Sequence, residues 1–136
     1  MSSSIIEVAV AILRRPDSSV LLCQRPAHKS YPLKWEFPGG KIEFGETAEQ
    51  ALARELTEEL SITAEIGALF HEEIAHYPAD GKTYQVRYFF VENWEGEIQN
   101  NVFANHRWVP PKAIAELDIL EGNWGVVGRL SGREGL

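Results

Sequence analysis

Three glutamates, Glu55, Glu58 and Glu59, stand three and four residues apart in one short segment of the chain. On a helix that turns about 100° per residue, they fall within one arc of about 100°. Like charges at this spacing repel one another, and Arg54 is the one basic side chain close enough along the segment to offset them. Such an arc is either a solvated acidic face or a set of oxygen ligands for a hard cation such as Mg²⁺.

On an arbitrary helix the solvated face is the better interpretation, but two neighbouring features favour a cation site. The arc borders an apolar stripe that contains Leu52 and Leu56, so the glutamates lie near the edge of the core. The pair Gly39-Gly40 stands a short loop upstream, and glycine lets a backbone approach a ligand closely. Cysteine and histidine are not spaced as zinc ligands, which argues against zinc.

Local patterns indicate the elements that would position these residues. Thr47 followed by Gln50 has the form of a capping box, which predicts a helix that begins there and ends at Ser61. Apolar runs separated by turn residues predict strands at 5–13, 20–24, 35–37, 62–75, 83–91 and 107–109. The first two strands, joined by the turn 15–19, are expected to form a hairpin. Further turns are expected at 26–34 and 76–81, and short helices at 110–115 and 121–130.

Strands outnumber helices in this reading, which predicts an α+β fold: a mixed sheet with helices packed on its faces. The chain has 136 residues, a length that suits a single domain over 1–136. It contains 44% hydrophobic and 24% charged residues, as soluble globular proteins do. Its lone Cys23 lies in an apolar run, so we expect a buried thiol and no internal disulfide.

The charge and the apolar pattern exclude some functions. The net charge of −7 argues against a partner that is a nucleic-acid polymer, because such partners are usually held by a basic stripe. No apolar run reaches the length of about 18 residues that a membrane-spanning helix needs. Residues 1–4 lack the features of a secretory signal, and a cytoplasmic location is expected.

A longer motif contains the glutamate arc. From Gly40 the chain reads glycine, five residues, Glu46, seven residues and then RELTEELSI at 54–62. This resembles the Nudix box, G-x5-E-x7-R-E-U-x-E-E-x-G-U with U aliphatic, at every fixed position except Ser61, where the family has glycine. Segments 35–43 and 91–97 are similar to the MutT branch of that family. The resemblance implies the Nudix α/β/α sandwich with its loop-helix-loop.

The resemblance also implies a catalytic metal site. In the family, Mg²⁺ or Mn²⁺ is held by box glutamates and a glycine carbonyl, which correspond here to Gly39, Glu55, Glu58 and Glu59. Arg54 would orient Glu55 and Glu58 by charge-assisted hydrogen bonds. Glu46 either ties the loop to the helix, supports the metal through water, or is an ordinary acid at a helix start. The metal would neutralise a triphosphate and activate the attacking water, and the residue that takes the proton is left open.

For the substrate, the MutT likeness implies base contacts from Arg25, Phe37 and Asn123, and Lys41 as a phosphate contact. The Asn123 amide can donate and accept at once, which suits a purine edge, although a turn residue is an equal interpretation. The implied reaction converts a nucleoside triphosphate to its monophosphate and pyrophosphate. The expected substrate is 8-oxo-dGTP, which would make the chain a DNA-repair enzyme of the nucleotide pool. The partner is then a small nucleotide, bound by a monomer or a homodimer.

Alternatives remain at this level. CTP or another pyrimidine triphosphate is the second substrate, and a non-catalytic nucleotide-binding Nudix domain is a different class. RNA 5′-end processing fits the acidic charge less well. The chain also departs from the family at Val102, where relatives often place another acidic ligand, and at Ser30, where MutT has a histidine. No role is assigned to His28 or His106.

Overall fold

The computed structural model describes residues 5–78 and 80–132, so residues 1–4 and the last four residues of the expected domain 1–136 lie outside the described residues. The strands are β1 (Ile5–Leu13), β2 (Val20–Gln24), β3 (Trp35–Glu36), β4 (Gly39–Lys41), β5 (Thr63–Glu65), β6 (Leu69–Tyr77), β7 (Lys82–Val91), β8 (Asn93–Glu95) and β9 (Asn105–Val109). The helices are α1 (Ala48–Leu60), the 3₁₀ turns η1 (Pro111–Glu116) and η2 (Glu121–Asn123), and α2 (Trp124–Leu130).

The strands form a mixed arrangement. The larger sheet has the order β4-β1-β7-β6, in which β1 runs parallel to β7 and antiparallel to β4. A second sheet, β3-β2-β9, is antiparallel throughout, and β5 pairs with β8. The mixed sheet that the sequence predicts is therefore confirmed.

The expected hairpin between the first two strands is wrong. Strand β1 lies in the larger sheet and β2 in the second one, and a single bridge between Arg14 and Val20 joins them. Both edges of β1 are already paired, one with β4 and the other with β7 along its whole length. A strand of buried apolar residues carries no local signal for its partner, so the turn at 15–19 was not enough to decide the pairing.

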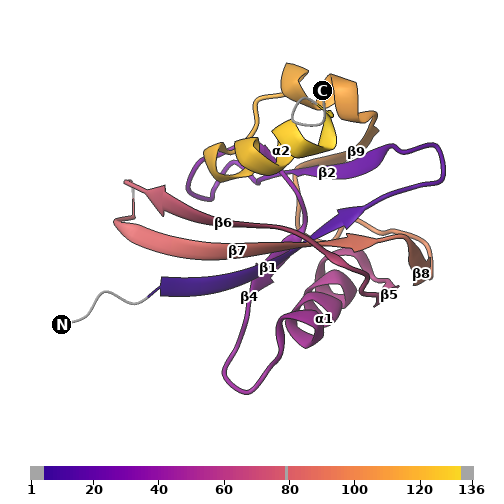
Figure 1. The fold of residues 1–136 in the computed structure, drawn as a ribbon, viewed down its shortest axis with the longest axis horizontal. Coiled ribbons are helices and arrows are strands. Elements are labelled where there is room, and N and C mark those ends of the chain that lie inside the picture. The colour runs from indigo at the N-terminus through magenta and orange to yellow at the C-terminus, as the bar shows by residue number, and fades with distance from the viewer. Residues whose placement is uncertain (1–4, 79, 133–136) are drawn as a thin grey trace.

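The layers follow from the alternation of side chains along β1. Ala9, Ala11 and Leu13 contact a core cluster that includes Leu52, Leu56 and Leu60 of α1. The alternate residues Val10 and Ile12 face a second cluster, which contains Ile114, Ile119, Val126 and Val127 of the C-terminal helices. Figure 1 shows α1 below the strands and α2 above them, which is the α/β/α sandwich expected from the sequence.

Helix α1 begins and ends where the sequence predicts. The Thr47 side chain accepts from the Gln50 amide, and the Gln50 side chain accepts from the Thr47 amide, so the capping box is complete. At the other end Ser61 takes the left-handed conformation, with φ 61°, in the place where the family has glycine. The buried leucine stripe fixes which face of α1 the glutamates occupy.

Other boundaries differ from the predictions. The extended segment expected at 62–75 is divided into β5 and β6, which lie in different sheets. Strand β6 continues to Tyr77, so the turn begins later than predicted, and 93–95 forms β8. The last helix begins as the 3₁₀ turn η2. Within residues 5–78 and 80–132, none of the helices is long and apolar enough to cross a membrane.

Candidate active site

A cavity of about 640 Å³ brings together most of the residues that the sequence singles out. Its wall includes Arg25, Phe37, Gly39, Lys41, Glu55, Glu59 and Asn123. Three of the predicted residues, Glu46, Arg54 and Glu58, are not part of that wall. Glu55 and Glu59 belong to α1, and Asn123 belongs to η2. The C-terminal helical segment and α1 lie on opposite sides of the strands, so the cavity wall is formed by residues from both sides and from the strands between them.

At one end of the cavity, the glutamates of α1 lie against the backbone of β4. The Gly39 amide donates a hydrogen bond to Glu59 Oε1 at 3.3 Å. A Cβ on Gly40 would stand 2.3 Å from the carboxyl carbon of Glu55, and one on Gly39 would stand 2.2 Å from the Ala9 carbonyl oxygen. Glycine is therefore needed at position 39 for β4 to lie against β1, and a side chain at position 40 would displace the Glu55 carboxylate.

The two carboxyl groups at this end are crowded and poorly solvated. Burial, together with the charges of Glu55 and Glu36, raises the pKa of Glu59 to about 9. Burial also raises the pKa of Glu55, and the nearby Arg54 partly opposes that rise. Because the negative charge of Glu55 helps to raise the pKa of Glu59, a positive charge placed beside the two carboxyl groups would relieve their repulsion.

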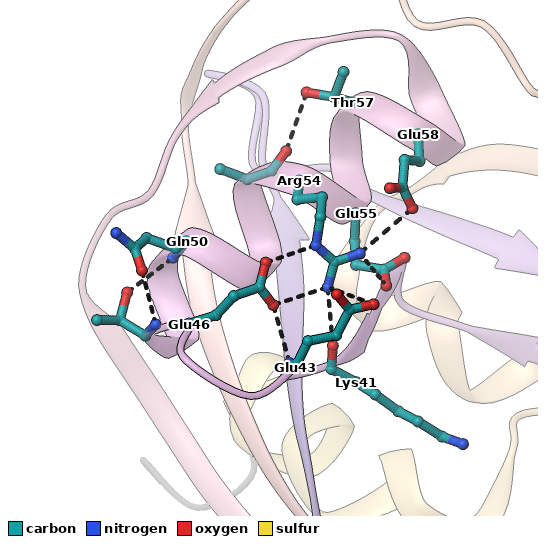
Figure 2. Close-up of polar contacts among 10 residues, drawn as sticks. Lys41, Glu43, Glu46, Gln50, Arg54, Glu55, Thr57 and Glu58 are labelled. Atoms are coloured by element: carbon teal, nitrogen blue, oxygen red, sulfur yellow. Dashed lines mark hydrogen bonds and ion pairs between the residues drawn. The ribbon is translucent and has the colours of Figure 1, made fainter.

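Arg54 lies behind the glutamates and links them to the loop before α1 (Figure 2). Its Nε donates to Glu46 Oε2 at 2.7 Å and its Nη1 to Glu55 Oε2 at 3.1 Å. Its Nη2 donates to the Lys41 carbonyl oxygen at 3.2 Å. Glu46 also accepts from the Glu43 amide, so it ties the loop to the helix. The hydrogen bond from Arg54 is the main cause that holds the pKa of Glu46 at about 2.

The predicted metal ligands are brought together only in part. Glu58 is 58% exposed and its carboxylate faces Arg54, at 3.5 Å, rather than the cavity. Among the described residues, no three acidic, histidine or cysteine side chains converge as a ready-made ligand set. Glu55 and Glu59 with the backbone at Gly39 nevertheless form a compact set of oxygens with raised carboxyl pKa values, which fits a hard divalent cation such as Mg²⁺ or Mn²⁺.

The other end of the cavity contains the residues predicted to contact the base. Arg25 donates to the Ser30 carbonyl oxygen at 2.8 Å and pairs with Glu36 at 3.2 Å. The Phe37 amide donates to Asn123 Oδ1 at 3.3 Å, which joins the strand β3 region to η2. Asn123 is buried, so it is held by the structure and is not an exposed turn residue.

Sequence reasoning missed the partners of these groups. Burial raises the pKa of Glu36, and Arg25 opposes the rise, so the two side chains form a half-buried ion pair in the cavity wall. Lys82, Tyr84 and Tyr88, at alternate positions of β7, also line the cavity. That period of two was visible in the sequence, but nothing in it showed which face of the strand would be hollowed.

The remaining sequence observations are placed as follows. Val102 lines the cavity, so the position where relatives often have an acid is at the site and is apolar here. His28 is exposed, Ser30 holds the Arg25 side chain, and His106 lies on β9, outside the cavity wall. Cys23 is fully buried, as the sequence predicts, and burial raises the pKa of its thiol.

Known proteins resemble the chain over nearly its whole length. The NUDIX domain model matches residues 5–129. An 8-oxo-dGTP diphosphatase of Escherichia coli K12 is 34% identical over 92% of this chain and 95% of its own length. A CTP pyrophosphohydrolase of the same organism is 36% identical over 85% of this chain and 89% of its own.

A solved structure supports the same assignment. It comes from work on MutT of Aliivibrio salmonicida and Vibrio cholerae, is 28% identical, and superimposes with a TM-score of 0.80 over 96% of this chain and 99% of that one. The box, the sandwich and these likenesses agree. The chain belongs to the NUDIX family and is a hydrolase that acts on phosphorus-containing anhydrides.

Proposed function

We propose that this hydrolase is a divalent-metal-dependent nucleoside triphosphate pyrophosphohydrolase whose principal substrate is 8-oxo-dGTP. The observation that carries the proposal is the cavity itself, which joins the crowded carboxyl pair Glu55 and Glu59 at one end to the oriented amide of Asn123 at the other. A triphosphate with a base attached needs both: acidic oxygens that hold a cation, and a polar group that reads the base.

Each residue at the acidic end has a distinct part in the proposal. Glu59 and Glu55 are the ligands, and Gly39 beside them provides bare backbone. Arg54 keeps Glu55 and the loop at Glu46 in place, so it is a positioning residue rather than one that touches substrate. The divalent cation supplies charge neutralisation of the triphosphate and acidification of the attacking water. Glu58 lies outside the cavity wall, where its carboxylate pairs with Arg54.

The reaction that these groups support is attack of water on a phosphorus of the triphosphate. The P–O bond to the departing pyrophosphate breaks as the P–O bond to water forms, and the water proton passes to a base of the site. The products are the nucleoside monophosphate and pyrophosphate. In the proposal Lys41, which lines the cavity and whose side chain points away from the Arg54 cluster in Figure 2, contacts a phosphate oxygen.

Recognition of the base rests on Asn123. Its carbonyl oxygen accepts from the Phe37 amide, so the amide nitrogen faces the cavity as a donor. A second lone pair on the same oxygen remains for a base N–H. The edge of 8-oxoguanine offers a carbonyl oxygen beside N7–H, which matches one donor and one acceptor. Guanine lacks the N7–H, so it would lose one of the two hydrogen bonds.

CTP is the second candidate, because the relative that is 36% identical is a CTP pyrophosphohydrolase. An amide can also pair with cytosine, which has both a donor and acceptors on its edge. The two candidates share the acidic end of the cavity and differ at Asn123. A role in sanitation of the nucleotide pool, a cytoplasmic location, a single domain, and a monomer or homodimer are parts of the same proposal.

A substrate panel tests the proposal. The values of kcat/KM for 8-oxo-dGTP, dGTP, CTP and dCTP are measured with Mg²⁺, with release of pyrophosphate as the readout. We expect 8-oxo-dGTP to be preferred over dGTP by at least about tenfold, the effect of one lost hydrogen bond to a buried polar group. A higher kcat/KM for CTP than for 8-oxo-dGTP would select the second candidate. No hydrolysis of any triphosphate would refute both.

A further inference from the structure

Two tyrosine hydroxyls hold the backbone of Gly122, the residue before Asn123. The Gly122 amide donates to Tyr77 Oη at 2.9 Å, and the Gly122 carbonyl oxygen accepts from Tyr88 Oη at 3.2 Å. Tyr77 lies at the end of β6 and Tyr88 on β7, so neighbouring strands of the larger sheet hold the two peptide groups that flank the Gly122 Cα. We call Tyr77, Tyr88 and Gly122 the peptide clamp.

The clamp depends on glycine at its centre. A Cβ on Gly122 would stand 2.2 Å from the Tyr77 hydroxyl oxygen and 3.2 Å from the Ala75 Cβ, so any other residue would push Tyr77 away. Burial raises the pKa of both Tyr77 and Tyr88, so both hydroxyls stay protonated. The clamp therefore keeps its donors and acceptors throughout the neutral range.

The residue that follows the clamp is Asn123, the residue assigned to the base. Its Oδ1 is bonded to the Phe37 amide, which fixes the amide from one side. Within residues 5–78 and 80–132 no acceptor is bonded to its Nδ2, and Asn123 lines the cavity, so its N–H groups are open to a ligand. The backbone that bears this side chain is located by the clamp on one side and by Phe37 on the other.

A third tyrosine lies beside the clamp but is not part of it. Tyr84 lies on β7 and lines the same cavity, and its ring is in edge-to-face contact with that of Tyr77, with 5.6 Å between centroids. Its hydroxyl donates to Asp80 at 2.9 Å instead of to η2. Tyr77 and Tyr88 thus bind the backbone of Gly122, whereas Tyr84 does not, so Tyr84 is a suitable control for the loss of a tyrosine hydroxyl.

We propose that Tyr77 and Tyr88 are positioning residues that determine base selectivity. They hold the backbone of Gly122 and so fix the Asn123 amide in the cavity. The proposal rests on the proposed function of Asn123. Hydrogen bonds reject a wrong base only when the protein group cannot move to follow it, because a mobile amide re-pairs with whichever edge is present. The clamp supplies that rigidity through hydrogen bonds from two neighbouring strands to the backbone next to Asn123.

The test uses the full chain and Tyr77→Phe, which keeps the ring and removes the hydroxyl. Tyr84→Phe is the matched control, and Gly122→Ala reaches the same contact from the opposite side. Calorimetry measures binding of 8-oxo-dGMP, dGMP, CMP and inorganic pyrophosphate, with Mg²⁺ present. Nitrogen-15 NMR follows the side-chain amide of Asn123.

We expect Tyr77→Phe and Gly122→Ala to shift the Asn123 amide resonances and to weaken the best-bound monophosphate by about fivefold, the equivalent of one hydrogen bond. Pyrophosphate, which has no base, should bind as it does to the unaltered chain. In turnover, KM for the preferred triphosphate should rise while kcat stays nearly constant. Tyr84→Phe should leave the Asn123 amide resonances unshifted, because the Tyr84 hydroxyl donates to Asp80 and not to Gly122.

Several results would overturn the inference. One is an unshifted Asn123 amide in Tyr77→Phe, and another is an equal loss of monophosphate and pyrophosphate binding, which would indicate general damage. If the unaltered chain binds a monophosphate but hydrolyses no triphosphate, the proposed function is refuted. The role of the clamp is then decided by whether Tyr77→Phe weakens binding of the monophosphate more than binding of pyrophosphate. Failure of the unaltered chain to bind any of the monophosphates would refute both.

Discussion

The Glu59 carboxylate of α1 accepts a hydrogen bond from the Gly39 amide of β4, with 3.3 Å between Oε1 and N. This contact joins the last turns of the box helix to Gly39, the residue directly before the box. It holds an acid with a pKa of about 9 beside the cavity, in contact with Glu55. The acidic end of the cavity is thus formed where two separate segments, β4 and the end of α1, come into contact.

Arg54→Ala should weaken Mg²⁺ binding by about 10- to 100-fold, the usual effect of removing a side chain that orients metal ligands. Arg54 bonds Glu55, Glu46 and the Lys41 carbonyl, so its loss frees both a ligand and the loop. Calorimetric titration with Mg²⁺ measures the effect. Arg14→Ala removes another arginine that pairs with a glutamate, Glu92, away from the cavity wall, and should leave the affinity unchanged. Equal affinities in the two variants would contradict the role of Arg54.

Glu46 should give the protein an acid-dependent part of its stability. The hydrogen bond from Arg54 lowers the pKa of Glu46 from 4.5 to about 2. The native state therefore binds this proton less tightly than the unfolded chain, so the contribution is complete above pH 4.5 and is lost as the pH falls through about 2. The free energies of unfolding of the unaltered chain and Glu46→Gln should accordingly converge as the pH falls through this window. In an Arg54→Ala background the same substitution should give no such convergence, and a persistent one would show that Arg54 is not the cause.

Ser61→Gly should have a small effect on stability and none on turnover. Ser61 has φ 61°, a conformation that costs a non-glycine residue about 1 kcal/mol. Its hydroxyl also accepts from Asn101 Nδ2 at 2.9 Å, a hydrogen bond that glycine would lose. Ser18, with φ 75°, is the control, because its side chain has no hydrogen-bond partner among the described residues.

Urea unfolding compares the two serine variants. Ser18→Gly should raise the unfolding free energy by about 0.5–1 kcal/mol, and Ser61→Gly by about 0.5 kcal/mol less, which is the net value of the lost hydrogen bond. Turnover should be the same in both. A fall in kcat for Ser61→Gly alone would mean that the hydroxyl, and not merely the helix end, supports the site.

Val102→Glu should strengthen Mg²⁺ binding by about fivefold. Val102 lines the cavity and is 49% exposed, so an acid there adds negative charge without being forced into the core. A charge pair in water at contact distance contributes about 1 kcal/mol, which is the source of the fivefold figure. Val102→Gln has nearly the same size and no charge, so it should bind Mg²⁺ as the unaltered chain does. If both variants bind Mg²⁺ equally well, the position does not reach the metal.

Local signals explain what the sequence could predict. The capping box at Thr47 and the leucine spacing are properties of neighbouring residues, and they predicted both ends of α1 and the face on which Glu55 and Glu59 lie. The partner of β1 was not predictable in this way, because pairing is decided by a strand far along the chain. The orientation of Glu58 was also missed, since it depends on where the Arg54 side chain settles.

The clamp shows the same limit at the other end of the cavity. Tyr77 and Gly122 are 45 residues apart, and no motif connects them. Tyr77 falls in the predicted turn 76–81 and Tyr88 in a predicted strand, and their hydroxyls acquire a role only when β6 and β7 meet η2. Residues in contiguous motifs were therefore found from the sequence, while residues that act through tertiary contacts were not.

The most direct measurement is release of pyrophosphate from 8-oxo-dGTP by the unaltered chain and by Glu59→Gln, with Mg²⁺ and with a chelator. Glu49→Gln, an exposed acid on the first turn of α1, is the control. We expect equal amounts of 8-oxo-dGMP and pyrophosphate from the unaltered chain and from Glu49→Gln, no reaction with the chelator, and a rate at least about 100-fold lower for Glu59→Gln. Undiminished turnover by Glu59→Gln, or turnover that survives the chelator, would contradict it.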